Sequence, residues 1–103
     1  MGASFKPGER VLIPVEVSVG AFPNESLVTF ETEEGSTSGF VRADQLINVN
    51  KNKDRGYLTG HVVSSDAHVV AVMVRGSFFT TTGLTHFSGD WARTNIRRAE
   101  AVA

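Results

Sequence analysis

Cysteine is absent from this chain of 103 residues. Its absence excludes a disulfide framework, a thiolate metal site and a cysteine nucleophile, and it fits a reducing compartment. Long apolar runs are missing too, because the longest one, residues 69–74, is far too short to span a membrane. The first eight residues lack the apolar core of a signal peptide. We therefore expect a cytoplasmic protein with no membrane association.

An excess of either charge is also missing, since 10 Lys and Arg stand against 11 Asp and Glu. General nucleic-acid binders usually carry a basic excess, because phosphate contacts supply most of their affinity. Two local basic clusters are nevertheless present, the second of them beside an aromatic residue that bases could stack on. The clusters are Lys51, Lys53 and Arg55, and Arg93, Arg97 and Arg98 next to Trp91. A nucleic-acid-binding barrel is therefore an alternative function, possible but not favoured by the overall charge.

Recognisable catalytic and cofactor motifs are absent as well. No serine lies in a nucleophile elbow, and the glycines form neither a dinucleotide-binding nor a Walker loop. A turn at residues 64–66 would bring His61, Asp66 and His68 together, but a metal site needs three or four ligands with orienting partners. We predict no catalytic residue, no cofactor and no metal, and favour a protein that is not an enzyme. A second alternative is a small enzyme or ligand-binding protein whose site forms at an oligomer interface, around His61, His68 and His86.

The hydrophobic pattern that is present has a period of two. β-branched residues occupy every second position from Val11 to Val19, which is typical of a half-buried strand. Pro14 cannot donate to a ladder, so it indicates an edge strand or a bulge. Further strands are predicted at 27–32, 39–42, 57–63, 68–75, 78–82 and 84–88. Because residues 69–74 are apolar on both faces, we expect that strand to be central and covered on both sides.

Turn residues divide these strands into two halves. Gly35 and Gly83 indicate hairpins, residues 43–46 indicate a tight turn or one-turn helix, and 48–56 is a polar loop. After Trp91 the pattern allows a short C-terminal helix or a last short strand with a frayed tail, and we favour the strand. The prediction is an all-β, mainly β domain over 1–103 that forms a small, partly open barrel. Its parts are a first β meander (5–47), the polar loop (48–56), a second meander (57–96) and a tail (97–103).

Two short segments, 39–46 and 90–96, share an order of aromatic, small apolar, Arg, small, Asp or Asn, and aliphatic residues. This indicates a weak internal repeat. Residues 5–47 resemble the bacterial SH3-like barrel domains, through the Gly8-Glu9-Arg10-Val11 opening and the Gly39-Phe40-Val41 strand with its polar turn ending in Leu46. The resemblance implies an SH3-like barrel. It does not imply recognition of proline-rich peptides, because the only Tyr and Trp lie outside this half.

Neighbouring phenylalanines supply the candidate contact surface. Phe78 and Phe79 place one ring on each face of a strand, so a half-exposed sheet leaves one near solvent, whereas a sheet covered on both faces buries both. Exposed apolar groups that cluster mark interfaces. The candidate interface is Phe22, Phe78, Phe79 and Trp91. These residues favour a non-enzymatic binding or assembly module that contacts a protein partner or associates with itself.

Overall fold

The computed structural model describes residues 5–20, 22–76, 78–80, 83–85 and 87–98. Within these ranges the chain forms nine strands and two short 3₁₀ helices. The first half contains β1 (Arg10–Val19), β2 (Glu25–Thr32), β3 (Gly35–Arg42) and η1 (Ala43–Gln45). The second contains β4 (Arg55–Ser65), β5 (Val69–Val74), β6 (Phe78–Thr80), β7 (Gly83–Thr85), β8 (Ser88–Ala92), η2 (Arg93–Asn95) and β9 (Arg97–Arg98). No helix in the described ranges has the length and apolar character needed to cross a membrane.

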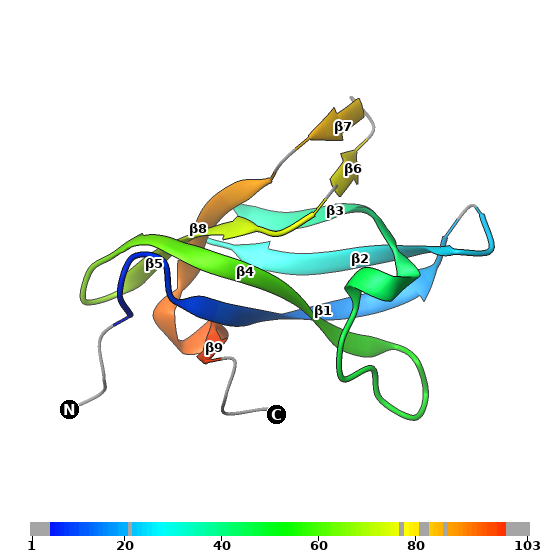
Figure 1. The fold of residues 1–103 in the computed structure, drawn as a ribbon, viewed down its shortest axis with the longest axis horizontal. Helices are drawn as coiled ribbons and strands as arrows, with labels where there is room; N and C mark the ends of the chain where they lie inside the picture. Colours follow the sequence, from blue (N-terminus) through cyan, green and yellow to red (C-terminus); the bar gives the residue numbers. More distant parts are fainter. Residues whose placement is uncertain (1–4, 21, 77, 81–82, 86, 99–103) are drawn as a thin grey trace.

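All strands belong to one antiparallel sheet. Its order is β7-β6-β3-β2-β1-β4-β5-β8, and β9 pairs with β1. The sheet curls strongly, and the β6–β7 hairpin rises away from it (Figure 1). At the far edge β8 returns to the β2–β3 turn, where the Glu33 N–H donates to the Asp90 carbonyl at 2.8 Å. The prediction of an all-β, partly open barrel is confirmed.

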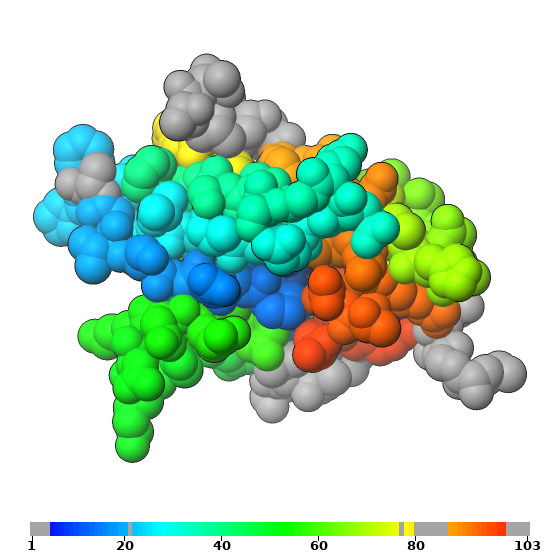
Figure 2. Space-filling view, turned by 180° about the vertical axis from the view of Figure 1, so that it is seen from behind, coloured from blue at the N-terminus to red at the C-terminus, as the bar shows by residue number. Residues whose placement is uncertain are grey.

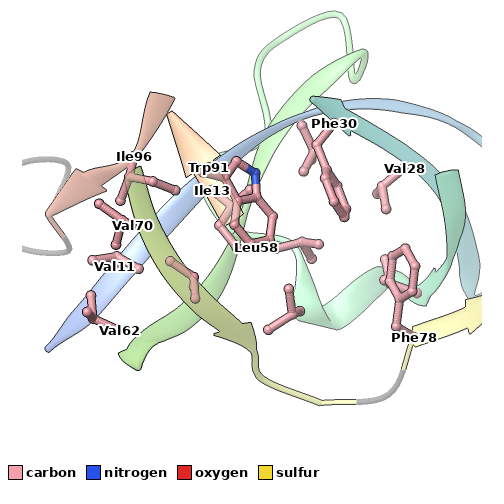
Figure 3. Close-up of a cluster of buried hydrophobic side chains, with 14 of the residues drawn as sticks. Val11, Ile13, Val28, Phe30, Leu58, Val62, Val70, Phe78, Trp91 and Ile96 are labelled. Atoms are coloured by element: carbon pink, nitrogen blue, oxygen red, sulfur yellow. The ribbon is translucent and has the colours of Figure 1, made fainter. Parts of the chain in front are cut away.

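The inner side of the curled sheet holds a single hydrophobic core. Alternate residues of β1, β4 and β5 point into it, as a period of two requires. Phe30 lies at its aromatic centre, with ring centroids 5.8 Å from Phe78, 5.4 Å from Phe87 and 5.4 Å from Trp91. Figure 3 shows Phe30, Phe78 and Trp91 on strands that are far apart in the sequence, with their side chains in one cluster. The core therefore depends on contacts between both halves of the chain.

β1 lies at the centre of the sheet, so the prediction of an edge strand is wrong. The Val17 N–H donates to the Asp54 carbonyl at 2.8 Å, which shows that odd-numbered backbone groups of β1 face β4. Pro14 is an even position, so its nitrogen faces the opposite side. There the β1–β2 ladder ends at the Glu16–Thr29 pair. A central strand tolerates this proline because no ladder hydrogen bond is required at that point.

β5 is an interior strand between β4 and β8, but only one of its faces is covered. Val70, Val72 and Val74 are buried, whereas Val69 and Ala71 are half-buried and Met73 is exposed. The expectation of a doubly covered strand is therefore wrong. Within the described ranges no second layer lies outside the curled sheet, so the apolar residues on both faces of this strand indicated an interior strand and not a covered one.

The favoured last strand forms, because Trp91 lies in β8, and the only helical segment after it in the described ranges is the three-residue η2. After β8 and η2, Arg97 and Arg98 pair with Leu12 and Val11 of β1; residues 99–103 lie outside the described part. The first half ends similarly, because η1 is followed by a bridge from Ile47 to Tyr57 of β4. The two segments of the weak repeat thus share a local structure of strand, 3₁₀ helix and returning bridge.

The predicted boundaries shift slightly at the loops. β4 already begins at Arg55, inside the predicted polar loop, and its pairing with β1 merges the two meanders into one sheet. Gly35 has a φ of 116° in the β2–β3 hairpin, as expected. The β6–β7 hairpin also forms, with Gly83 as the first residue of β7 paired with Thr80, as Gly35 is the first residue of β3 paired with Thr32.

Candidate functional site

A cleft opens where β1 and β2 separate. Their ladder ends at Glu16 and Thr29, and on the same side of β1 the short strand β9 reaches only Val11 and Leu12. Beside residues 13–15 of β1, no described residue of β2 pairs with β1. A cavity of about 590 Å³ lies beside this unpaired stretch. We call it the split cleft. Its walls come from β1, β2, the start of β4, η2, β9 and the loop that carries Asn48 and Asn50, and Trp91 contributes to its lining.

Trp91 is the innermost polar group of the split cleft. The side chain is 1% exposed, and its indole Nε1 has no hydrogen-bond partner among the described residues. In Figure 3 the nitrogen lies on the side of the indole that faces Phe30. Buried polar atoms in native proteins nearly always have a partner, and an unpaired donor costs about 1–3 kcal/mol. An acceptor that reached this N–H would remove that cost.

Several other lining side chains are also uncommitted. Within the part of the chain that the structure describes, the side chains of Glu16, Arg55, Tyr57 and Asn95 form no hydrogen bond or ion pair. They come from β1, β4 and η2, so the sheet topology alone brings them together. Their exposed ends provide donors and acceptors around the mouth of the cleft.

Other lining residues have structural partners. Thr29 Oγ1 and Ser38 Oγ are 2.8 Å apart, and Glu31 accepts a hydrogen bond from the Ser36 hydroxyl at 2.5 Å. The Arg97 guanidinium donates to a backbone carbonyl of η2 at 3.1 Å. These contacts hold the walls in place.

The charges of the split cleft balance. Arg55 and Arg97 stand against Glu16 and Glu31. Arg55 and Glu16 are cross-strand neighbours in the β1–β4 ladder. Such a mixed lining gives no net attraction for a phosphate-rich ligand, which needs a positive surface.

A second concave surface lies at the other end of β1. Its volume is about 650 Å³, and its apolar lining includes Val17, Val19, Phe22, Leu46 and Val49. Val19 is 93% exposed, Phe22 69% and Val49 41%, whereas Val17 and Leu46 pack against the core. We call this surface the apolar groove. It is the uncovered continuation of the hydrophobic core.

The apolar groove lies between two protrusions, the described residues of the β1–β2 connection and the 48–54 loop, which stand out at one end of the molecule (Figure 2). The connection turns tightly at Gly20, where a Cβ atom would lie 2.4 Å from the Glu25 carbonyl oxygen. In the loop, the Asn50 side-chain oxygen accepts backbone N–H bonds from Asp54 and Arg55 at 3.0 and 3.1 Å. These local bonds hold the loop in the position that places Val49 in the groove.

The structure separates the predicted interface residues into two pairs. Phe78 and Trp91 are 0% and 1% exposed, so they belong to the core and not to a contact surface. Phe22 lines the apolar groove, and Phe79 is 40% exposed. The alternation of Phe78 and Phe79 across β6 matches a sheet with one exposed face. Only Phe22 and Phe79 offer accessible rings.

The predicted basic residues are dispersed. Lys51 lies exposed in the 48–54 loop and Lys53 lines the apolar groove, whereas Arg55 and Arg97 meet at the split cleft. Arg98 forms an ion pair with Glu9 and lies 4.6 Å from the Phe5 ring centroid, and Arg93 is half-buried at the start of η2. One residue from each cluster thus reaches the same cleft, but no continuous basic surface forms from the six.

The predicted histidine cluster does not form a metal centre in the described ranges, where no three His, Asp or Glu side chains gather. The Asp66 carboxylate instead accepts the backbone N–H groups of His68 and Val69, both at 2.8 Å. These hydrogen bonds lower the pKa of Asp66 below its ordinary value of 3.8. Asp66 therefore organises the β4–β5 turn, while His86 lies outside the described residues.

Sequence reasoning missed both cavities and the residues Glu16, Val19, Val49, Tyr57 and Asn95 that line them. Pro14 was the available signal for the split cleft, since a proline within a strand also marks a place where a ladder ends. The polar and apolar groups around it come from distant segments, so no local spacing could reveal their meeting. Comparisons of the chain with protein-family models, with curated proteins and with solved structures find no match.

Proposed function

We propose that this protein is a non-enzymatic binding module that associates with a second copy of itself through the apolar groove. The observation that carries the proposal is the exposure of Val19, Phe22 and Val49 around one concavity. Grouped apolar side chains in water mark interfaces. The strand, 3₁₀ helix and returning bridge in each half support an SH3-like barrel as the scaffold that holds this surface.

A second copy suits the groove because a protruding side chain and a hollow that could receive it lie on the same patch. Phe22 stands exposed at the rim, and the valines line the adjoining hollow. A two-fold interface uses one self-complementary patch on both subunits. In this arrangement the Phe22 ring of each copy enters the groove of the other.

The expected affinity of the dimer follows from the apolar surface that it would bury. Burying a phenylalanine side chain fully contributes about 1.5–3 kcal/mol, and the symmetric contact buries two Phe22 rings with the exposed valines beside them. Association itself costs at least about 4 kcal/mol. We therefore expect a weak dimer, with a Kd between about 1 μM and 1 mM.

Sedimentation over a dilution series tests the proposal. The wild-type protein should change from monomer to dimer as its concentration rises through this range. Phe22→Ser and Val19→Ser should remain monomeric at every concentration. Val63→Ser is the matched control, because Val63 is also an exposed valine, at 49%, but lies on β4 outside the groove.

The control variant should dimerise like the wild-type protein. A wild-type protein that stays monomeric up to about 1 mM would show that no second copy fills the groove. Equal effects of Val19→Ser and Val63→Ser would show that exposed valines act non-specifically. Circular dichroism of each variant establishes that the fold is intact.

A further inference from the structure

We infer that the split cleft is a binding site for a small neutral saccharide, held between β1 and β2 with the indole N–H of Trp91 as its innermost donor. This site shares only Asn50 with the apolar groove and does not depend on self-association. It rests on the cavity, the unpaired buried N–H and the uncommitted side chains at the mouth.

The ends of the split cleft limit the size of the ligand. At one end β1 and β2 are joined by the Glu16–Thr29 pair, and at the other Leu12 pairs with Arg97 of β9. Only residues 13–15 of β1 lie between, a length of about 10 Å at the usual rise of a strand. The volume of about 590 Å³ is that of a small-molecule site.

The polar groups of the split cleft favour hydroxyls. Trp91 and Arg55 only donate hydrogen bonds, the Glu16 carboxylate only accepts them, and the Asn95 amide does both. A hydroxyl group also donates and accepts, so neighbouring hydroxyls of a sugar ring can satisfy Glu16 and Arg55 together. The Tyr57 ring adds an aromatic surface for the less polar face of a sugar.

Charge argues against ionic ligands. Each arginine of the split cleft is matched by a glutamate, so a free anion meets Glu16 and Glu31 as well as the cations. A neutral ligand gains the same hydrogen bonds without this repulsion. Neutral saccharides therefore fit the lining better than phosphate does.

Entry of the ligand requires a small opening of the sheet. The Trp91 N–H is closed off from solvent, so an acceptor reaches it only if the walls of the cleft part further. Towards the N-terminal end of β1, the last described pair that joins β1 to β2 is Glu16–Thr29. The two strands can therefore separate further beside Pro14 without breaking a described pair. Binding must therefore change the surroundings of the indole.

Intrinsic fluorescence reports directly on this change, because Trp91 is the only tryptophan of the chain. Glucose, galactose, maltose and cellobiose are each titrated to about 10 mM, ten times a Kd of 1 mM. Glycine and inorganic phosphate serve as zwitterionic and anionic comparisons. We expect a saturable change with at least one saccharide and none with glycine or phosphate.

Two variants assign the response to the split cleft. Glu16→Gln and Asn95→Ala should each raise the Kd of the responding saccharide about tenfold, the effect of losing one hydrogen bond to a well-placed group. Glu34→Gln and Asn52→Ala are the matched controls, because both residues are exposed and lie outside the cleft. The controls should keep the wild-type Kd.

Several results would overturn the inference. These are the absence of a saturable response to every saccharide, a response to glycine or phosphate alone, or equal Kd values for Glu16→Gln and Glu34→Gln. The Val19→Ser variant separates this outcome from that of the proposed self-association. It should lose dimer formation and keep the saccharide response, since Val19 does not line the split cleft.

Discussion

At the scale of single residues, burial and hydrogen bonding are in conflict at Trp91. The indole packs against Phe30 and Phe87, with centroid distances of 5.4 and 6.0 Å, and so contributes strongly to the core. Its N–H has no partner in the described part of the structure and therefore costs stability. The residue is favourable as an aromatic ring and unfavourable as a donor.

Replacing Trp91 with Phe separates these two contributions. The substitution keeps an aromatic ring and removes an N–H that forms no hydrogen bond. We therefore expect the free energy of unfolding to fall by at most about 2 kcal/mol, because of the smaller side-chain volume alone. Trp91→Ala should lose about 3–5 kcal/mol. Urea unfolding followed by circular dichroism measures both, and equal losses would contradict an unpaired N–H.

Asp66 shows how a single exposed carboxylate orders a turn. The backbone N–H groups of His68 and Val69 donate to it and lower its pKa below 3.8. The folded state thus favours the charged form, and this stabilisation is present above the ordinary pKa and is lost as the pH falls through the lowered value.

An NMR titration from about pH 6 to about pH 2 tests this sign. The amide resonances of His68 and Val69 should shift with a midpoint below that of an ordinary aspartate. In Asp66→Asn the same amides should show no such transition. A midpoint at or above 3.8 would contradict the hydrogen bonds to the charged carboxylate.

At the scale of elements, β1 explains why the sheet splits. Its odd-numbered backbone groups pair with β4, whereas its even-numbered groups pair first with β9 and later with β2. Pro14 lies between these two partners, where a backbone N–H would have no ladder to join. β1 thus pairs with β9 and with β2 along the same edge, and the split cleft is the space between these two partners.

Proline should therefore be tolerated at position 14 of β1 and destabilising at position 18. Pro14→Ser should change the free energy of unfolding by less than about 1 kcal/mol, since no ladder bond is involved. Ser18→Pro should cost at least about 1–3 kcal/mol, because Ser18 pairs with Leu27 of β2 and its side chain is exposed. Thermal or urea unfolding of the pair gives the answer. A large loss in Pro14→Ser would show that this proline has another structural role.

Contact between β3 and β6 depends on a glycine. A Cβ atom at Gly39 would lie 2.4 Å from the Phe78 ring and 2.8 Å from the Phe79 carbonyl oxygen. We expect Gly39→Ala to cost about 1–3 kcal/mol through overpacking. Ser38→Ala, on the next residue and the opposite face, should cost less. The free energies of unfolding of the two variants test this, and an unaffected Gly39→Ala would contradict the close approach of β6.

At the scale of the whole molecule, one curled sheet presents two different surfaces. The split cleft is polar and balanced in charge, whereas the apolar groove is an uncovered extension of the core. The split cleft opens where β1 changes partner from β9 to β2, whereas the apolar groove lies where the far end of β1 extends beyond the core. The formal net charge of −1 gives little long-range attraction for any charged partner.

Salt should therefore have little effect on the proposed self-association. Between about 50 and 500 mM NaCl we expect the dimer Kd to change by less than about threefold, since apolar burial and not ion pairing drives the contact. Sedimentation at the two salt concentrations measures it. A steep weakening with salt is the behaviour of phosphate-binding proteins and would instead favour the basic residues as the functional surface.

The sequence by itself determined the strands, because the period of two and the turn-forming glycines are local properties of neighbouring residues. It also indicated that Phe78 and Phe79 point to opposite faces, for the same reason. Tertiary structure alone decided that β1 is central, that Trp91 is buried, and that Glu16, Arg55 and Asn95 share a cleft. These facts depend on strand order and on the curl of the sheet. Both are set by contacts between segments far apart in the chain, which no local pattern records.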